Sequence, residues 1–200
     1  MSVLVGRPAP DFTAAAVMPD GSINEAFKLS DLKGKYVVLF FYPLDFTFVC
    51  PSEIIAHDHR VDAFKERGVE IVGVSIDSQF THYAWRNTAP ENGGIGAVKF
   101  PLVADVKHEI QEAYDVAHPE AGVALRGSFL IDKDGIVQSQ QVNNLPLGRN
   151  VDEMIRLVDA LQFTEEHGEV CPAGWNKGDE GMKPDADGVA SYLAKNSESL

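Results

Sequence analysis

Two apolar runs with a helical stripe between them restrict the fold of this 200-residue chain more than any other feature. YVVLFFY, residues 36–42, is a continuous β-prone run, as in strands that are covered on both faces. VEIVGVS, residues 69–75, is a second such run. Between them, Cys50, Ile54, His57, Val61 and Phe64 recur at spacings of 4, 3, 4 and 3, which predicts a helix that ends at Gly68. Residues 36–75 are therefore predicted to form a βαβ unit.

The middle of the chain continues the alternation of helix and strand. Helices are predicted over residues 80–87 and 107–115, with a short strand in FPLVAD, residues 100–105. SFLIDKDGIVQSQQV, residues 128–142, predicts a hairpin, because Asp134-Gly135 tolerates the positive φ of a tight turn. These elements favour one α/β domain.

The amino-acid composition of the chain changes near residue 165. Asn150 followed by Glu153 resembles a capping box ahead of a periodic apolar helix. Beyond that helix, glycine, proline and charged residues dominate. We therefore predict a main domain over residues 1–165 and an arm over residues 166–200.

Charge and apolar patterning limit the partners and the compartment. The formal net charge of −13 argues against nucleic acid or an anionic membrane as a partner, since both would repel the chain. No stretch approaches the roughly 18 consecutive apolar residues of a transmembrane helix. The first residues lack a basic region followed by an apolar run, so we expect no signal peptide and a soluble, cytoplasmic protein. A structural disulfide is not expected there, so the two cysteines indicate catalysis, redox exchange or packing.

Cys50 lies at the predicted start of a helix, where unpaired N–H groups and a partial positive charge favour a thiolate. An ordinary thiol is about 3% ionised at pH 7, so complete ionisation raises reactivity only about thirtyfold. A fast thiol enzyme therefore also needs groups that stabilise the transition state. Glu53 occupies the position of the second sulfur of a C-x-x-C dithiol, which leaves Cys171 as the other thiol of the chain. On position alone, a packing cysteine remains an equal alternative.

Several motifs resemble those of a known family. The pattern Pro43-x-x-x-Thr47-x-x-Cys50 is similar to the active-site motif of the peroxiredoxins. FYPLDFTFVCPSE, with RGSFLID, LPLGRN and EVCPAGW in order, resembles the typical two-cysteine peroxiredoxins of bacteria, the alkyl hydroperoxide reductase C type. The resemblance begins at RPAPDF, residues 7–12, and covers nearly the whole chain. It implies a thioredoxin-like α/β fold, with a central mixed sheet, helices on both sides and an extended C-terminal arm.

The resemblance also implies a reaction. Cys50 matches the peroxidatic cysteine, whose thiolate attacks a peroxide oxygen and becomes a sulfenic acid. Cys171 matches the resolving cysteine, which forms a disulfide with Cys50 of the partner subunit. The implied substrates are hydrogen peroxide and organic hydroperoxides, with no metal and no bound cofactor. The implied reductant is thioredoxin or a flavoprotein disulfide reductase, of which the tail over residues 178–200 favours thioredoxin. The implied assembly is a homodimer, with five dimers forming a decamer.

Five further residues match positions that support Cys50 in the family. Thr47 is expected to orient the peroxide, and Arg126 to contact both thiolate and peroxide through its fork of donors. Pro43 is expected to shield the sulfur from water. Glu53 and Arg149 resemble residues that position Arg126. The plain alternatives are a turn cap for Thr47, a strand end for Pro43 and a surface ion pair for Arg126.

Two other functions compete with the peroxidase. One is a stress chaperone or redox relay, and the other is a structural thioredoxin-fold module with inert cysteines; the complete set of motifs favours the enzyme. Family members that are easily over-oxidised carry a GGLG loop and a C-terminal Tyr-Phe pair. This chain has the similar Gly93–Gly96 loop but Tyr192-Leu193 in the tail, so we expect intermediate sensitivity. The six histidines show no metal-like spacing, and for His82 we expect packing or a subunit contact.

Overall fold

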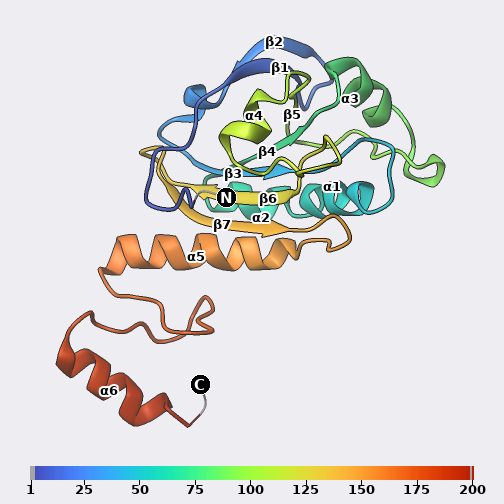
Figure 1. Cartoon of the computed structure of the whole chain (residues 1–200). Coiled ribbons are helices and arrows are strands. Elements are labelled where there is room, and N and C mark those ends of the chain that lie inside the picture. Colours follow the sequence, from blue (N-terminus) through green and yellow to red (C-terminus); the bar gives the residue numbers. More distant parts are fainter. Residues whose placement is uncertain (1–2, 199) are drawn as a thin grey trace. The chain divides into compact units, whose positions relative to one another are not determined.

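The computed structural model describes residues 3–198 and residue 200. The chain divides into two compact units, residues 1–151 and residues 152–200 (Figure 1). Across the described part of the chain, every helix is too short or too polar to span a membrane.

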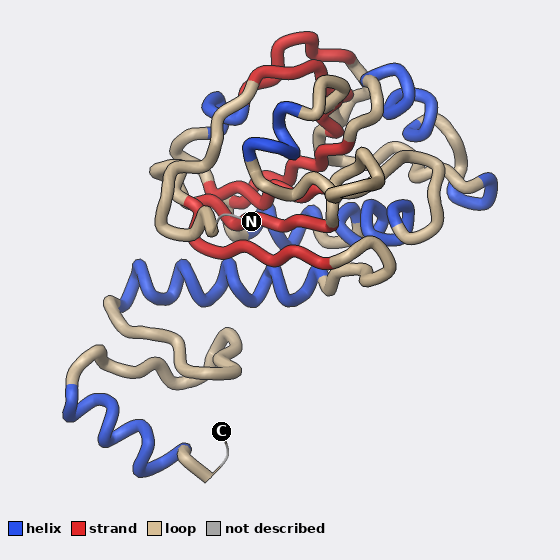
Figure 2. Tube along the Cα trace, in the orientation of Figure 1, coloured by secondary structure: helices blue, strands red, loops and turns tan. Residues whose placement is uncertain are grey.

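The first unit is built on one mixed sheet (Figure 2). Within the described residues, the sheet has seven strands in the order β2-β1-β5-β4-β3-β6-β7. The pairs β3–β4 and β4–β5 are parallel, and the other neighbours are antiparallel. The strands are β1 (Thr13–Val17), β2 (Ile23–Lys28), β3 (Tyr36–Phe41), β4 (Val69–Ser75), β5 (Leu102–Ala104), β6 (Arg126–Ile131) and β7 (Val137–Asn143).

Helices cover both faces of this sheet, as β3 shows. All six residues of β3 are buried, and successive side chains point to opposite faces. Phe40 stacks on His57 of α1, with ring centroids 4.1 Å apart, whereas Phe41 meets Tyr114, which follows α4, at 5.2 Å. The continuous apolar run therefore arises from burial on both sides, and the predicted α/β class is confirmed. The helices of this unit are α1 (Cys50–Asp58), α2 (Val61–Glu66), α3 (Gln79–Arg86) and α4 (Glu109–Ala113), with 3₁₀ turns at Leu29–Leu32 and Pro90–Asn92.

The single helix predicted between the first two runs is wrong in one respect. It is interrupted after α1, where the Arg60 amide bonds to the carbonyl of His57 and tightens the chain into a 3₁₀-type turn before α2. The five positions of the stripe are all buried nonetheless. The pattern correctly indicated the buried face but not the break in the backbone.

The other predicted elements of this unit are present with small shifts in their bounds. The helix predicted over residues 80–87 is α3, which begins after Ser78, whose hydroxyl caps it by accepting from the Thr81 amide. The predicted hairpin is β6–β7. The β1–β2 hairpin was not predicted, because β2 has a single buried residue and shows no apolar run.

The second unit contains two helices and the loop between them. These are α5 (Val151–His167), which begins at the last residue of the first unit, and α6 (Ala186–Asn196). The periodic apolar helix predicted after Asn150 is α5. Between the helices, an isolated bridge pairs Val170 with Met182.

Candidate active site

Cys50 is the first residue of α1, and its side chain is 1% exposed. The loop over residues 43–49 joins β3 to this helix and contains Pro43, which is buried, and Thr47, which is partly buried. The thiol is free. It therefore lies at a helix N-terminus, as the sequence predicted, but beneath the surface rather than on it.

Arg126 provides the charged contact to this sulfur. It is the first residue of β6, and its Nη1 lies 3.6 Å from Cys50 Sγ, within hydrogen-bonding range for sulfur. The same Nη1 donates to Glu53 Oε2 at 2.6 Å, and Nε donates to the Leu145 carbonyl at 2.7 Å. Since Arg126 is itself buried, this guanidinium is fixed beside the thiol by bonds on two sides.

Glu53 joins the two arginines that the sequence motifs singled out. It lies one turn after Cys50 on α1 and is buried. Arg149 donates to its carboxylate from Nε at 2.8 Å, from Nη2 at 2.9 Å and from the backbone amide at 2.9 Å. Nη1 of Arg149 donates to the carbonyls of Phe41, at 2.8 Å, and Gly127, at 2.7 Å. The carboxylate thus fixes both guanidinium groups relative to the start of α1.

The charges of this cluster leave a positive excess next to the sulfur. Burial favours the neutral acid of Glu53, but the Arg149 hydrogen bonds and the two guanidinium charges outweigh it, so the pKa of Glu53 is lowered. Two guanidinium groups and one carboxylate carry a net charge of +1. A thiolate at Cys50 balances that charge, and in a buried site such a charge acts with little screening by solvent.

His57 lies behind Glu53 and adds no charge. Its Nδ1 donates to the Glu53 carbonyl at 2.7 Å, and its ring stacks on Phe40. Burial, together with the charge of Arg149, lowers the pKa of His57 to about 3. The His57 ring is therefore neutral at physiological pH and packs against Phe40 next to the charged cluster.

A second polar network, which was not predicted from the sequence, fixes the loop before Cys50. Asp45 accepts from the Tyr42 hydroxyl at 2.8 Å and pairs with His82 Nδ1 at 2.7 Å, while its amide donates to Asp77 at 2.9 Å. Burial raises the pKa of Asp45, although the His82 hydrogen bond opposes the shift. His82 is fully buried, so it packs inside this unit rather than serving a subunit contact. In the sequence, Asp45 stands between apolar residues in PLDFTF, and this was the available signal that the acid is buried.

Thr47 and Pro43 lie in this loop rather than in the charged cluster. The Thr47 hydroxyl donates to the Leu44 carbonyl at 2.8 Å, which leaves its oxygen lone pairs as acceptors. The structure therefore brings Cys50, Glu53, Arg126 and Arg149 into one bonded cluster and places Pro43 and Thr47 in the loop that precedes the sulfur.

Cys171 belongs to the second unit and has different surroundings. Its thiol is free and partly buried, and Sγ donates to the Ala160 carbonyl of α5 at 3.5 Å. Thr164 Oγ1 lies 3.8 Å from the same sulfur. Among the described residues of both units, no group of three His, Cys, Asp or Glu side chains could hold a metal ion.

Comparisons with known proteins identify the family of the chain. The family model described as "AhpC/TSA family" matches residues 5–140, and the model "C-terminal domain of 1-Cys peroxiredoxin" matches residues 160–195. Alkyl hydroperoxide reductase C of Buchnera aphidicola subsp. Schizaphis graminum is 57% identical over 96% of this chain and 98% of that protein. Alkyl hydroperoxide reductase C of Helicobacter pylori strain J99 is 58% identical over 99% of this chain and 100% of that protein.

A solved structure extends the similarity to the fold. The reduced 2-Cys peroxiredoxin of Plasmodium vivax matches with a TM-score of 0.94 and 52% identity, over 96% of this chain and 100% of that one. The fold and these relatives together define the chain as a thiol-dependent peroxidase. The chain belongs to the AhpC/TSA family, and it is an enzyme of the peroxidase class.

Proposed function

We propose that Cys50 is the peroxidatic cysteine and reduces hydrogen peroxide and organic hydroperoxides. Its thiolate attacks the terminal peroxide oxygen, so an S–O bond forms while the O–O bond breaks. The leaving oxygen takes up a proton and departs as water or an alcohol, and Cys50 becomes a sulfenic acid. The observation that supports this assignment most directly is the 3.6 Å contact between Arg126 Nη1 and the buried Cys50 sulfur.

Arg126 and Thr47 are proposed to act on the reacting atoms. Negative charge shifts from the sulfur to the leaving oxygen, so a donor that contacts both stabilises the transition state. Arg126 is already bonded to the sulfur, and its fork has further N–H groups for the peroxide. Thr47 already donates to a carbonyl and can accept the peroxide O–H.

Glu53, Arg149 and Pro43 are proposed to support this geometry. Glu53 binds Arg126 and Arg149 together and keeps the first at the sulfur. Pro43 is buried in the loop before Cys50, has no N–H group to attract water, and shields the sulfur. These three residues act through Arg126 or through exclusion of water rather than on the peroxide.

Cys171 is proposed to resolve the sulfenic acid of Cys50 in the partner subunit. Its thiolate attacks the Cys50 sulfur, the S–S bond forms, and hydroxide leaves and is protonated to water. Residues 1–165 then form the peroxidase domain and residues 166–200 the arm that carries Cys171. The names of the similar proteins differ on this point, since one family model is named for 1-Cys peroxiredoxins and one similar solved structure is named a 2-Cys peroxiredoxin.

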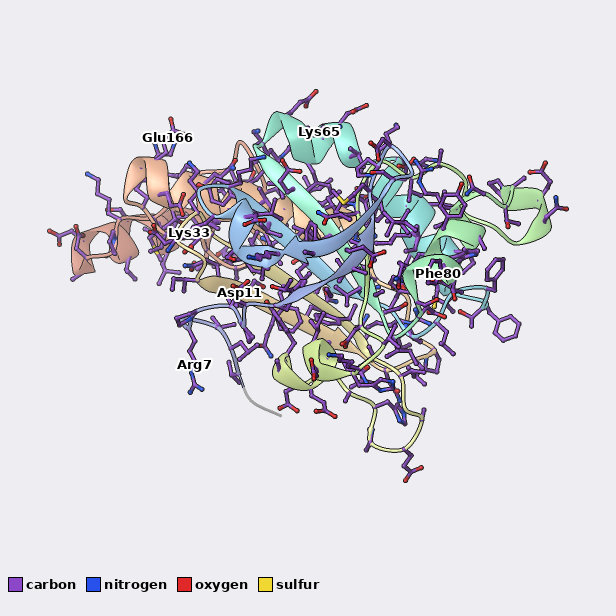
Figure 3. All side chains as sticks on the ribbon, turned by 90° about the horizontal axis from the view of Figure 1, so that it is seen from above. Arg7, Asp11, Lys33, Lys65, Phe80 and Glu166 are labelled. Atoms are coloured by element: carbon purple, nitrogen blue, oxygen red, sulfur yellow. The ribbon has the colours of Figure 1, made fainter. Side chains whose placement is uncertain are left out.

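We propose that two copies of the chain form a homodimer and that five dimers form a decamer. An aromatic patch of the first unit supports such contacts: Phe46, Phe48, Phe80 and Tyr83 are 50%, 95%, 65% and 47% exposed. The first two lie in the loop before α1 and the others on α3, where Phe80 is labelled in Figure 3. The bond between Asp45 and His82 ties this loop to α3, so the patch is one region.

The reductant and the compartment follow from the same proposal. The Cys50–Cys171 disulfide is returned to two thiols by thioredoxin or by a flavoprotein disulfide reductase, in the cytoplasm.

The test is a single oxidation of the reduced protein. One equivalent of hydrogen peroxide is added, free thiols are trapped, and a non-reducing denaturing gel is combined with peptide mapping. We expect a band near twice 21.8 kDa that contains Cys50 linked to Cys171. Cys50→Ser should abolish oxidation, and Cys171→Ser should stop at the sulfenic acid. Two thiols that stay reduced in the wild type would refute the peroxidase assignment of Cys50.

A further inference from the structure

The loop that carries Cys171 is closed on itself. We call residues 170–182 the arm loop. Its two ends are joined by a pair of backbone hydrogen bonds between Val170 and Met182, of 2.8 and 2.9 Å. Inside it, the Trp175 indole donates to the Asp179 carbonyl at 3.1 Å. The arm loop therefore keeps its own shape and can move as one piece.

Arg156 attaches this loop to α5. Its Nη1 donates to the Trp175 carbonyl at 2.8 Å, while Nε and Nη2 donate to the two carboxylate oxygens of Glu153, both at 2.7 Å. Glu153 lies one turn earlier on α5, so the pair orients the guanidinium along the helix surface. The Trp175 ring is 3% exposed and lies 4.9 Å from the ring of Phe163, also on α5. One planar guanidinium thus clamps the helix to the backbone of the loop.

The attached loop holds Cys171 in an unreactive pose. Its thiol donates to the Ala160 carbonyl, and a carbonyl accepts only while the sulfur keeps its proton. A disulfide with Cys50 requires the two Cα atoms to lie about 4.4–6.8 Å apart, and Cys50 is itself buried. The sulfur must therefore leave Ala160 before it can attack.

We propose that Arg156 is a positioning residue for the resolution step, which holds the arm loop on α5 and so slows the release of Cys171. This inference rests on the proposed role of Cys171 as the resolving cysteine. While the loop stays attached, the sulfenic acid of Cys50 persists and a second peroxide converts it to the sulfinic acid, with loss of water. Arg156 thereby affects the ratio of disulfide formation to over-oxidation, in addition to the Gly93–Gly96 loop and Tyr192-Leu193 that the sequence indicated.

The experiment compares full-length variants in a single turnover. Arg156→Met removes the clamp, Arg156→Lys keeps the charge but not the fork, and Glu153→Gln weakens the orientation of the guanidinium. Arg67→Met is the matched control, because it also removes a guanidinium that donates to a backbone carbonyl, that of Ala63, but belongs to the first unit rather than to the unit that contains the arm loop. Timed thiol trapping measures disulfide formation, loss of peroxide measures the first step, and mass spectrometry measures the sulfinic acid at rising peroxide.

For Arg156→Met we expect disulfide formation about fivefold faster than in the wild type, since one charge-assisted but partly exposed hydrogen bond is lost. The sulfinic fraction at a given peroxide concentration should fall, while the first step stays unchanged. Arg156→Lys and Glu153→Gln should lie between Arg156→Met and the control.

Two outcomes would overturn the inference. Unchanged disulfide formation in Arg156→Met would show that the clamp does not limit release, and slower formation would show that Arg156 promotes the attack instead. Failure of the proposed function has a different signature, because the wild type then forms no Cys50–Cys171 disulfide at all.

Discussion

Replacement of Arg126 by methionine tests the source of the reactivity of Cys50. Methionine is unbranched and similar in length, so it fills the site without charge. The variant should fold, because Glu53 keeps three hydrogen bonds from Arg149. The net charge of the cluster falls from +1 to zero. The main change is therefore the loss of the donor that contacts the sulfur.

The size of the effect has two separable parts. Loss of support for the thiolate costs at most about thirtyfold at pH 7, since an ordinary thiol of pKa about 8.5 is still about 3% ionised. Loss of one buried donor to the developing charge costs a further 10²–10³-fold, or about 2.7–4 kcal/mol. We therefore expect a loss of about 10³–10⁴-fold in the rate of the first step at pH 7. At pH 9.5, where an ordinary thiol is about 90% ionised, only the second part should remain.

The assay is rapid mixing with hydrogen peroxide at pH 7 and at pH 9.5, with the loss of peroxide as the readout. Arg67→Met is the matched control, because that guanidinium donates to the Ala63 carbonyl on α2. If Arg126→Met recovered the full wild-type rate at pH 9.5, Arg126 would only promote ionisation. If its rate at pH 7 were unchanged, the assigned role of Arg126 would be wrong.

Three further predictions concern the cluster and the assembly. Glu53→Gln leaves two buried guanidinium groups without their carboxylate, so the free energy of unfolding in urea should fall by about 3–5 kcal/mol. The pKa of His57 is lowered to about 3. Between about pH 6.5 and 3 the unfolded chain therefore binds a proton that the folded protein does not. The free energy of unfolding should fall on acidification through this range by up to about 1.4 kcal/mol per pH unit. His57→Phe should flatten that fall, as measured by urea midpoints at pH 7, 5 and 4; an unchanged slope contradicts the assignment. Phe80→Ala combined with Tyr83→Ala should shift sedimentation toward smaller species, whereas Val106→Ser, at a 55% exposed position, should not.

The sequence was sufficient for the elements whose pattern is local. β3 and β4 are buried on both faces, so each is a continuous β-prone run. The five residues of the helical stripe between them are all buried. β2 has one buried residue and carries no such signal. The break between α1 and α2 was equally invisible, because the positions on either side of it keep the spacing of one helix.

The active site followed from the sequence only in part, because its contacts are distant along the chain. The position of Cys50 at a helix start could be derived from the local pattern. Glu53 and Arg149, however, are 96 residues apart, and Asp45 and His82 are 37 apart. No periodicity relates such pairs. The resemblance to a family indicated the first pair. The second was missed because the apolar residues around Asp45 indicate a buried acid but do not identify His82 as its partner.

The geometry also supports the different roles that are proposed for the two arginines of the cluster. Arg149 uses Nε and Nη2 for Glu53 and Nη1 for backbone carbonyls, so its charge is neutralised locally and its position is fixed. Arg126 shares one nitrogen between Glu53 and the sulfur. Since Arg149 alone satisfies both carboxylate oxygens, the remaining positive charge of the cluster lies on Arg126. The guanidinium that contacts Cys50 is therefore also the one whose charge a thiolate can neutralise.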